Sequence, residues 1–165
     1  MTNIDIVNGI IFQKLGVSNF DFNSRLISQK KMYLLKVLGT DLGYEYNWYV
    51  RGPYSPSLTN YIYNYIDVLS ATDFSNYKLS EKAQNNIDIV NSLSDHSSEL
   101  GLTIASLYEL LASLLYIKIN EKSLKVTNKD DLFNKLIQFK PKYTKEQCNK
   151  AYNILDNTIL KNQEN

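Results

Sequence analysis

Residues Arg25 to Ser55 read RLISQKKMYLLKVLGTDLGYEYNWYVRGPYS. This block holds both arginines of the chain, its only tryptophan and one of its three prolines. Its apolar residues first recur every three to four positions, which is the spacing of an amphipathic helix. They then alternate with polar residues along Tyr44–Val50, as in a strand, and Gly52-Pro53 marks a turn. The block therefore predicts a helix, a strand and a turn that leads into a further helix.

Helical spacing and capping signals continue on both sides of this block. Ser55 is suited to cap the helix that begins at Pro56, because a proline at the first helical position loses no hydrogen bond. Thr2, Ser80 and Asn128 are also placed to cap helices, and Thr144 and Gln147 are spaced as a capping box. A second short strand is expected at Phe74–Leu79. The predicted helices cover residues 2–15, 23–39, 56–69, 80–93, 99–119, 128–140 and 144–160.

This pattern predicts one mainly α domain over residues 1–165, a length that a single domain readily accommodates. Residues 1–95 are expected to be winged-helix-like, because helices there flank a short two-stranded hairpin. Residues 96–160 are expected to form a C-terminal helical extension. The polar residues 161–165 are expected to fray, as exposed chain ends do.

Composition excludes several classes of protein. The 44% hydrophobic and 21% charged content indicates a globular chain and excludes extensive disorder. A single cysteine excludes an internal disulfide framework and favours a reducing, cytoplasmic setting. The N-terminus lacks the basic start followed by an apolar run that marks a signal peptide, so we expect no signal peptide. The apolar segment Leu100–Ile117 contains Glu109 and several hydroxyl side chains, so we interpret it as a buried helix and expect no membrane association.

Groups suited to catalysis are few. His96 lies in a polar joint and is expected to be an exposed loop histidine, and Cys148 lies on the apolar stripe of the last helix and is expected to be a buried thiol. We predict no catalytic, cofactor-binding or metal-binding residue, and therefore no enzyme. Glu109 lies within the most apolar segment, where an unpaired carboxylate is unfavourable. We expect it to point outward or to meet a cation; the sharper alternative is a structural ion pair with Arg25 or Arg51.

Groups suited to binding gather in the Arg25–Ser55 block. Tyrosine, tryptophan and arginine dominate the energetics of protein interfaces, and arginine holds anions in a fixed fork. Gln29, Lys30 and Tyr33 are expected to meet the turn and set its shape. The residues predicted to shape the turn itself are Gly52, Pro53 and Ser55. The residues predicted to bind a partner are Arg51, Tyr54, Trp48, Lys30, Lys31 and Arg25.

The predicted function is a non-enzymatic protein-interaction or regulatory module, with another protein as its partner. The alternative is a DNA-binding winged-helix regulator that forms a homodimer through its C-terminal helices. In that case cations of the 23–39 helix and the turn would contact the DNA backbone. The net charge of +1 and the absence of any cation from residues 56–69 favour the protein partner.

The block resembles a family of uncharacterised, phage-associated prokaryotic proteins that share a Gln-Lys-x-x-Tyr helix and a Gly-Pro-Tyr-Ser turn. The resemblance spans most of the chain. The segments that carry it are residues 25–26, 29–30, 33–35, 38–39, 42–44, 48–49, 52–55, 109–113 and 140–144. A more distant similarity is to the Panacea antitoxin domain, although Ser28 and Lys31 stand where leucines are usual in that family. These resemblances imply an antitoxin or a phage or plasmid defence or counter-defence component.

Overall fold

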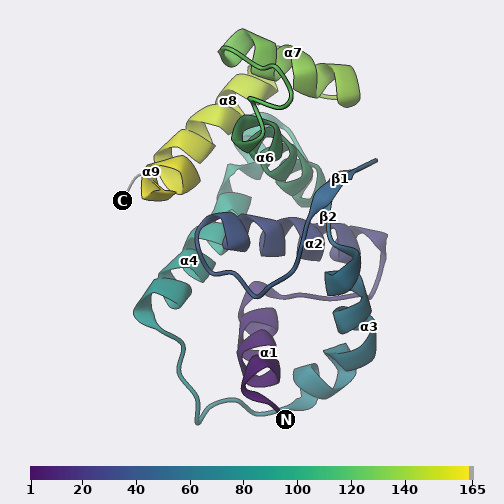
Figure 1. Ribbon diagram of the computed structural model, residues 1–165, viewed down its shortest axis with the longest axis vertical. Helices are drawn as coiled ribbons and strands as arrows, with labels where there is room; N and C mark the ends of the chain where they lie inside the picture. Colours follow the sequence, from purple (N-terminus) through teal and green to yellow (C-terminus); the bar gives the residue numbers. More distant parts are fainter. Residues whose placement is uncertain (164–165) are drawn as a thin grey trace.

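The computed structural model describes residues 1–163, which are mainly helical with one two-stranded antiparallel sheet (Figure 1). The elements are α1 (Asn3–Leu15), α2 (Phe22–Val37), β1 (Asn47–Tyr49), β2 (Gly52–Tyr54), α3 (Pro56–Ala71), α4 (Glu81–Ser92), η1 (Leu93–His96), α5 (Ser97–Leu100), α6 (Ile104–Ile119), α7 (Lys129–Phe139), α8 (Lys145–Leu155), η2 (Asp156–Leu160) and α9 (Lys161–Gln163). In Figure 1, α1 and α3 lie on one side of α2, and α6, α7 and α8 lie on the other. The β1–β2 hairpin stands between these two groups.

Side-chain caps set where most of the helices begin. The caps that the sequence predicts are confirmed at Thr2, Ser55, Ser80, Asn128 and Thr144, each of which accepts a hydrogen bond from a backbone N–H of the first turn. Helix α2 begins earlier than predicted, because Asp21 caps it by accepting from the Ser24 amide. Capping stabilises a helix by about 1 kcal/mol and so fixes its first residue.

The hairpin differs from the prediction in its second strand. The predicted strand Tyr44–Val50 is reduced to β1, and β1 pairs with β2, so the expected strand at Phe74–Leu79 is wrong. Only two residues separate β1 from β2, and Gly52, with a φ of 93°, allows such a tight connection. Strand β1 therefore pairs with its neighbour in the sequence, β2, and not with the segment at Phe74. The Phe74 side chain is instead buried against α1.

The predicted buried helix over residues 99–119 is confirmed as α6, but it begins later than expected, because the chain breaks after α5. Gly101 has a φ of 65°, in the left-handed region that ends a helix, and its amide donates back to the last turn. Thr103 then caps α6 by accepting from the Ser106 amide. Apolar residues continue through this break, which is why periodicity alone did not reveal it.

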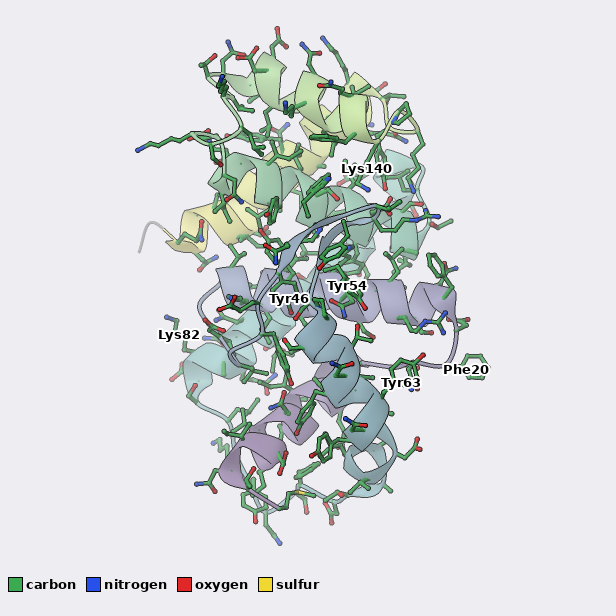
Figure 2. The ribbon with its side chains drawn as sticks, turned by 45° about the vertical axis from the view of Figure 1, so that its right-hand side comes forward. Phe20, Tyr46, Tyr54, Tyr63, Lys82 and Lys140 are labelled. Carbon is green, nitrogen blue, oxygen red and sulfur yellow. The ribbon has the colours of Figure 1, made fainter. Side chains whose placement is uncertain are left out.

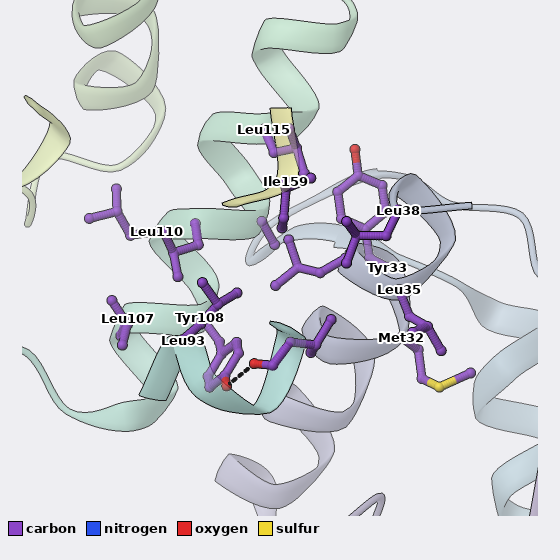
Figure 3. Close-up of a cluster of buried hydrophobic side chains, with 14 of the residues drawn as sticks. Met32, Tyr33, Leu35, Leu38, Leu93, Leu107, Tyr108, Leu110, Leu115 and Ile159 are labelled. Carbon is purple, nitrogen blue, oxygen red and sulfur yellow. Dashed lines mark hydrogen bonds between the residues drawn. The ribbon is translucent and has the colours of Figure 1, made fainter. Parts of the chain in front are cut away.

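Helix α6 is the centre of the hydrophobic core. Its completely buried leucines are Leu107, Leu110, Leu111, Leu114 and Leu115. Helices α2, α7 and α8 and strand β2 all pack against it. Figure 3 shows side chains of α2 facing those of α6, with the buried Tyr108 hydroxyl donating to the Val90 carbonyl at 2.6 Å. One core therefore extends across both predicted halves of the chain.

The C-terminal segment packs against the core. The predicted apolar stripe of α8 is confirmed, since Cys148, Ala151 and Leu155 are buried. Residues Lys161–Gln163 form a short helix, and the Gln163 side-chain amide donates to the Val37 carbonyl at 3.1 Å. The rest of the tail that was expected to fray, residues 164–165, lies outside the described residues.

Candidate functional site

Two neighbouring side chains of α2 hold the turn that follows the hairpin. The Gln29 side-chain amide accepts from the Ser55 amide at 2.9 Å and donates to the Ser55 carbonyl at 3.1 Å and to the Thr59 hydroxyl at 2.8 Å. The Lys30 ammonium donates to the Pro53 carbonyl at 2.7 Å. The prediction that Gln29 and Lys30 contact the Gly52–Ser55 segment is confirmed, but Gly52 and Pro53 belong to strand β2, and the turn itself lies at residues 50–51. Tyr33 packs its ring against Tyr46 and Tyr116.

Helix α6 supports the hairpin from behind. A side chain at Gly52 would place its Cβ only 2.3 Å from the Ser113 hydroxyl, and the φ of 93° also disfavours other residues there. Glycine is therefore required at this position for two reasons: its backbone conformation and the close approach of the backbone to α6. The contact brings the hairpin loop, which includes Arg51, next to Glu109, one helical turn before Ser113 on α6.

Glu109 is almost completely buried and is surrounded by cations. Its Oε2 accepts from the Lys142 ammonium at 2.7 Å and from the Tyr143 hydroxyl at 2.9 Å. Its Oε1 lies 3.8 Å from the Lys140 ammonium and 4.0 Å from the Arg51 guanidinium, with no hydrogen bond from the described residues. The sharper prediction, an ion pair with an arginine, is confirmed for Arg51 and is wrong for Arg25.

Lys140 links the C-terminal helices to the hairpin. Its ammonium donates to the Val50 carbonyl at 3.0 Å and lies 5.5 Å from the centre of the Trp48 ring. Trp48 in turn packs against Tyr116 of α6 and Phe139 of α7. The hairpin is therefore held from α2 on one side and from α6 and the α7–α8 connection on the other.

The charges behind the hairpin perturb one another. The pKa of Lys30 is lowered to about 7, mainly by burial; the charge of Glu109 raises this pKa, and the charges of Lys140 and Arg51 lower it. Burial also lowers the pKa of Lys140. Burial raises the pKa of Glu109, but the Lys142 hydrogen bond, the Lys140 charge and the Tyr143 hydroxyl outweigh burial and bring that pKa below its usual value. Glu109 is therefore ionised at neutral pH.

The lowered pKa of Lys30 predicts a rise in stability with pH. Between about pH 7 and 8.5 the unfolded chain keeps the Lys30 proton and the folded chain releases it, so the free energy of unfolding increases, by roughly 1–2 kcal/mol. Below pH 7 the full unfavourable effect of burying the charge remains. Urea denaturation at several pH values measures this slope. Lys30→Met is expected to reduce it, and an unchanged slope would show that Lys30 is not its source.

A pocket of about 410 Å³ opens beside the hairpin, between the α1–α2 connection, α2, the hairpin and α3. Its walls are mainly apolar and aromatic. Three cations reach it, and no aspartate or glutamate lines it. The Arg51 guanidinium lies 5.3 Å from the centre of the Phe22 ring. The lining residues are Ser18, Asn19, Phe22, Arg25, Leu26, Gln29, Lys30, Tyr49, Val50, Arg51, Tyr54, Thr59, Ile62 and Tyr63.

Four exposed apolar or aromatic side chains line this pocket, and a fifth, Phe20, follows the lining residue Asn19 in the chain. We call them the aromatic face, which consists of Phe20, Phe22, Tyr49, Val50 and Tyr63. The relative exposures of Val50 and Phe20, 89% and 87%, are the highest among the exposed large hydrophobic residues. Figure 2 shows Tyr54 and Tyr63 following one another down this side of the molecule, with Phe20 projecting outward. A concentration of exposed apolar groups at one cleft is typical of a binding surface.

The structure brings four of the six predicted partner-binding residues to the pocket: Arg25, Lys30, Arg51 and Tyr54. It does not bring the other two. Trp48 packs against α6 and α7, as described above. Lys31 donates to the Leu15 carbonyl at 2.9 Å and to the Asn91 side chain at 3.2 Å, and so ties α1 to α4.

The sequence prediction missed Phe22, Tyr49 and Tyr63. A signal for Tyr63 was present, because this aromatic residue lies on the otherwise polar side of the α3 stripe. Tyr49 points away from the apolar side of the predicted strand in the same way. Phe22 gave no such signal, since it lies in the first turn of α2, before the region where the helix was expected to begin.

The other candidate groups lie outside the pocket. Cys148 is completely buried, and burial raises its pKa to about 11, so the predicted buried thiol is confirmed. His96 lies in η1 with its ring nitrogen 2.5 Å from the Glu99 carboxylate. Within residues 1–163 no three acidic, histidine or cysteine side chains are grouped to hold a metal ion. In the same residues no single helix is long and apolar enough to cross a membrane; Glu81–Leu100 and Ile104–Ile119 meet that criterion only together, bent by 110°.

No family model, curated protein or solved structure matches the chain. Any link to phage-associated proteins or to the Panacea domain stays a prediction.

Proposed function

We propose that the protein is a non-enzymatic interaction module that binds a partner protein through the pocket and the aromatic face. The observation that carries this proposal is the meeting of exposed aromatic side chains with Arg51 and Tyr54 at one apolar pocket. Aromatic residues and arginine at a desolvated centre carry most of the binding energy of protein interfaces. The buried Cys148 thiol and the position of His96 outside the pocket support a non-enzymatic role.

The rigidity of the pocket supports the same proposal. Tyr54 is held by the Thr59 hydroxyl, which donates to its phenol oxygen at 2.7 Å, and by the Tyr49 ring at a centroid distance of 5.1 Å. Thr59 is itself held by Gln29. Side chains that are already fixed lose little conformational freedom on binding, so more of the contact energy contributes to affinity.

DNA binding by a winged-helix arrangement is the alternative that the sequence raised. In it the hairpin would act as the wing and α3 as the recognition helix. Helix α3 contains no lysine or arginine and carries Asp67, so it lacks the cations that contact phosphates. We therefore expect no shift of duplex DNA in a mobility-shift assay at low salt. A salt-sensitive shift would favour the DNA-binding alternative.

We further propose that the partner is a toxin or another component of phage or plasmid conflict, which makes the protein an antitoxin or a defence or counter-defence factor. The resemblance of the Gln29–Tyr33 helix and the Gly52–Ser55 turn to phage-associated proteins and to the Panacea domain supports this step. This step is argued from the sequence alone.

Loss of an exposed aromatic side chain or of an arginine at the pocket tests the proposal. Tyr63→Ser and Arg51→Ala are expected to reduce partner recovery in a quantitative pull-down by about tenfold or more, because each removes more than 1 kcal/mol at the pocket. Tyr77→Ser is the matched control, since Tyr77 is 53% exposed and does not line the pocket. Unchanged recovery with folded Tyr63→Ser and Arg51→Ala proteins would contradict the proposal.

A further inference from the structure

We propose that the pocket binds an acidic segment of the partner protein, in which side-chain carboxylates stand next to an aromatic residue. This inference rests on the proposed function and adds the chemistry of the occupant. The aromatic residue would enter the apolar part of the pocket, and the carboxylates would meet the guanidinium groups of Arg25 and Arg51.

The first observation is a local excess of positive charge. Arg51, Lys140 and Lys142 all lie within 4.0 Å of the single carboxylate of Glu109, and Arg25 lines the pocket together with Arg51. The chain as a whole has a net charge of only +1. The hairpin therefore concentrates cations that one carboxylate does not balance. An anionic ligand beside the hairpin would supply the missing charge.

The second observation is that the two arginines have donors to offer. Arg51 is 53% exposed, and its contact with Glu109 at 4.0 Å is too long for a hydrogen bond. Arg25 is exposed, and its side chain forms no hydrogen bond or ion pair with residues 1–163; the carboxylate that its charge affects is Asp21. A ligand carboxylate would therefore gain charge-assisted hydrogen bonds without displacing existing ones.

The third observation concerns the shape and walls of the pocket. A volume of about 410 Å³ accommodates a few side chains, and the lining is mainly apolar. A single chain terminus would bring one carboxylate, whereas two exposed guanidinium groups line the pocket. An acidic segment brings several carboxylates and an aromatic side chain together. Nucleic acid fits less well, because the neighbouring helix α3 offers its phosphates no cation.

Peptide binding followed by NMR tests the inference. The probes are acetyl-Gly-Phe-Asp-Asp-Phe-Gly-amide and the same peptide with Asn in place of both Asp, added to the full ¹⁵N-labelled chain. We expect the acidic peptide to bind about tenfold more tightly and to shift the amides of Val50, Arg51 and Phe22. Arg51→Met is expected to reduce the ratio of the two dissociation constants, because only Arg25 is then left to meet the carboxylates. Phe22→Ser is expected to weaken both peptides while the ratio is kept.

The control for overall charge is Lys78→Met, which removes one cation outside the pocket and is expected to keep the tenfold ratio. Equal binding of the two peptides, no binding of either, or shifts away from the pocket would overturn the inference. Tighter binding of a short single-stranded or duplex DNA at the same amides would overturn it in favour of nucleic acid. The proposed function fails separately, if Tyr63→Ser and Arg51→Ala proteins keep their partner in the pull-down.

Discussion

Glu109→Leu is expected to lower the free energy of unfolding by about 3–5 kcal/mol, the usual effect of removing one member of a buried ion pair. The main cause is Lys140, whose side chain is only 5% exposed and would lose its carboxylate. Arg51 and Lys142 are about half exposed, so water compensates them in part. Folded domains are stable by only about 5–15 kcal/mol, so this loss would be large. Urea denaturation followed by circular dichroism measures it.

Two variants separate the buried pair from a general effect of charge. Glu146→Gln removes a carboxylate that is 79% exposed and pairs with Lys150, and it is expected to change stability by less than about 0.5 kcal/mol. Glu109→Leu combined with Lys140→Met removes both members of the buried pair and is expected to recover a substantial part of the loss. If the double variant loses as much free energy of unfolding as the sum of the losses in the two single variants, the Glu109–Lys140 interaction is not the source of the instability.

Gln29→Leu is expected to lower the free energy of unfolding by about 2–3 kcal/mol and also to weaken partner binding. Ser55 is completely buried, and within residues 1–163 its amide donates only to the Gln29 side chain, so the substitution leaves a buried N–H without an acceptor. The Ser55 carbonyl keeps the bond from the Thr59 amide, which limits the effect. Gln29 also sets the position of the turn beside the pocket, so Gln29→Leu should widen the pocket. Partner binding should therefore weaken even though Arg51 and Tyr54 are both kept.

Hydrogen exchange locates the effect of Gln29→Leu. The Ser55 amide is expected to exchange much faster in the variant, whereas the core amides of α6 keep their relative protection. Gln138→Leu, at an exposed position of α7, is the matched control and is expected to change neither stability nor exchange by a measurable amount. A Ser55 amide that stays protected would contradict the assigned role of Gln29.

The sequence predicted most helices because their signals are local. Caps such as Thr2, Ser80 and Asn128 need only the residues that follow them, and each was found where it was expected. The break at Gly101 was missed because apolar residues continue through it. The second strand was misplaced because a two-residue connection depends on the φ of Gly52. The sequence does not show which φ a glycine adopts.

The site was predicted only in part because it joins distant segments. The Gly-Pro turn and Arg51 stood out in the sequence, and so did Glu109 as a carboxylate in an apolar segment. Nothing in the sequence places Lys140 and Lys142 beside it, because that meeting depends on how the α7–α8 connection packs against α6. Likewise, Phe22 and Tyr63 become neighbours of Arg51 only when α2, α3 and the hairpin are packed together.

The central claim is that the pocket and the aromatic face contact the partner protein. A photo-crosslinking amino acid placed at Val50, which is 89% exposed beside the pocket, tests it most directly in cells that contain the partner. We predict a single discrete adduct from position 50, its loss when Arg51→Ala is added, and no such adduct from position 77. The same adduct from Tyr77, or an adduct from Tyr77 and none from Val50, would contradict the account.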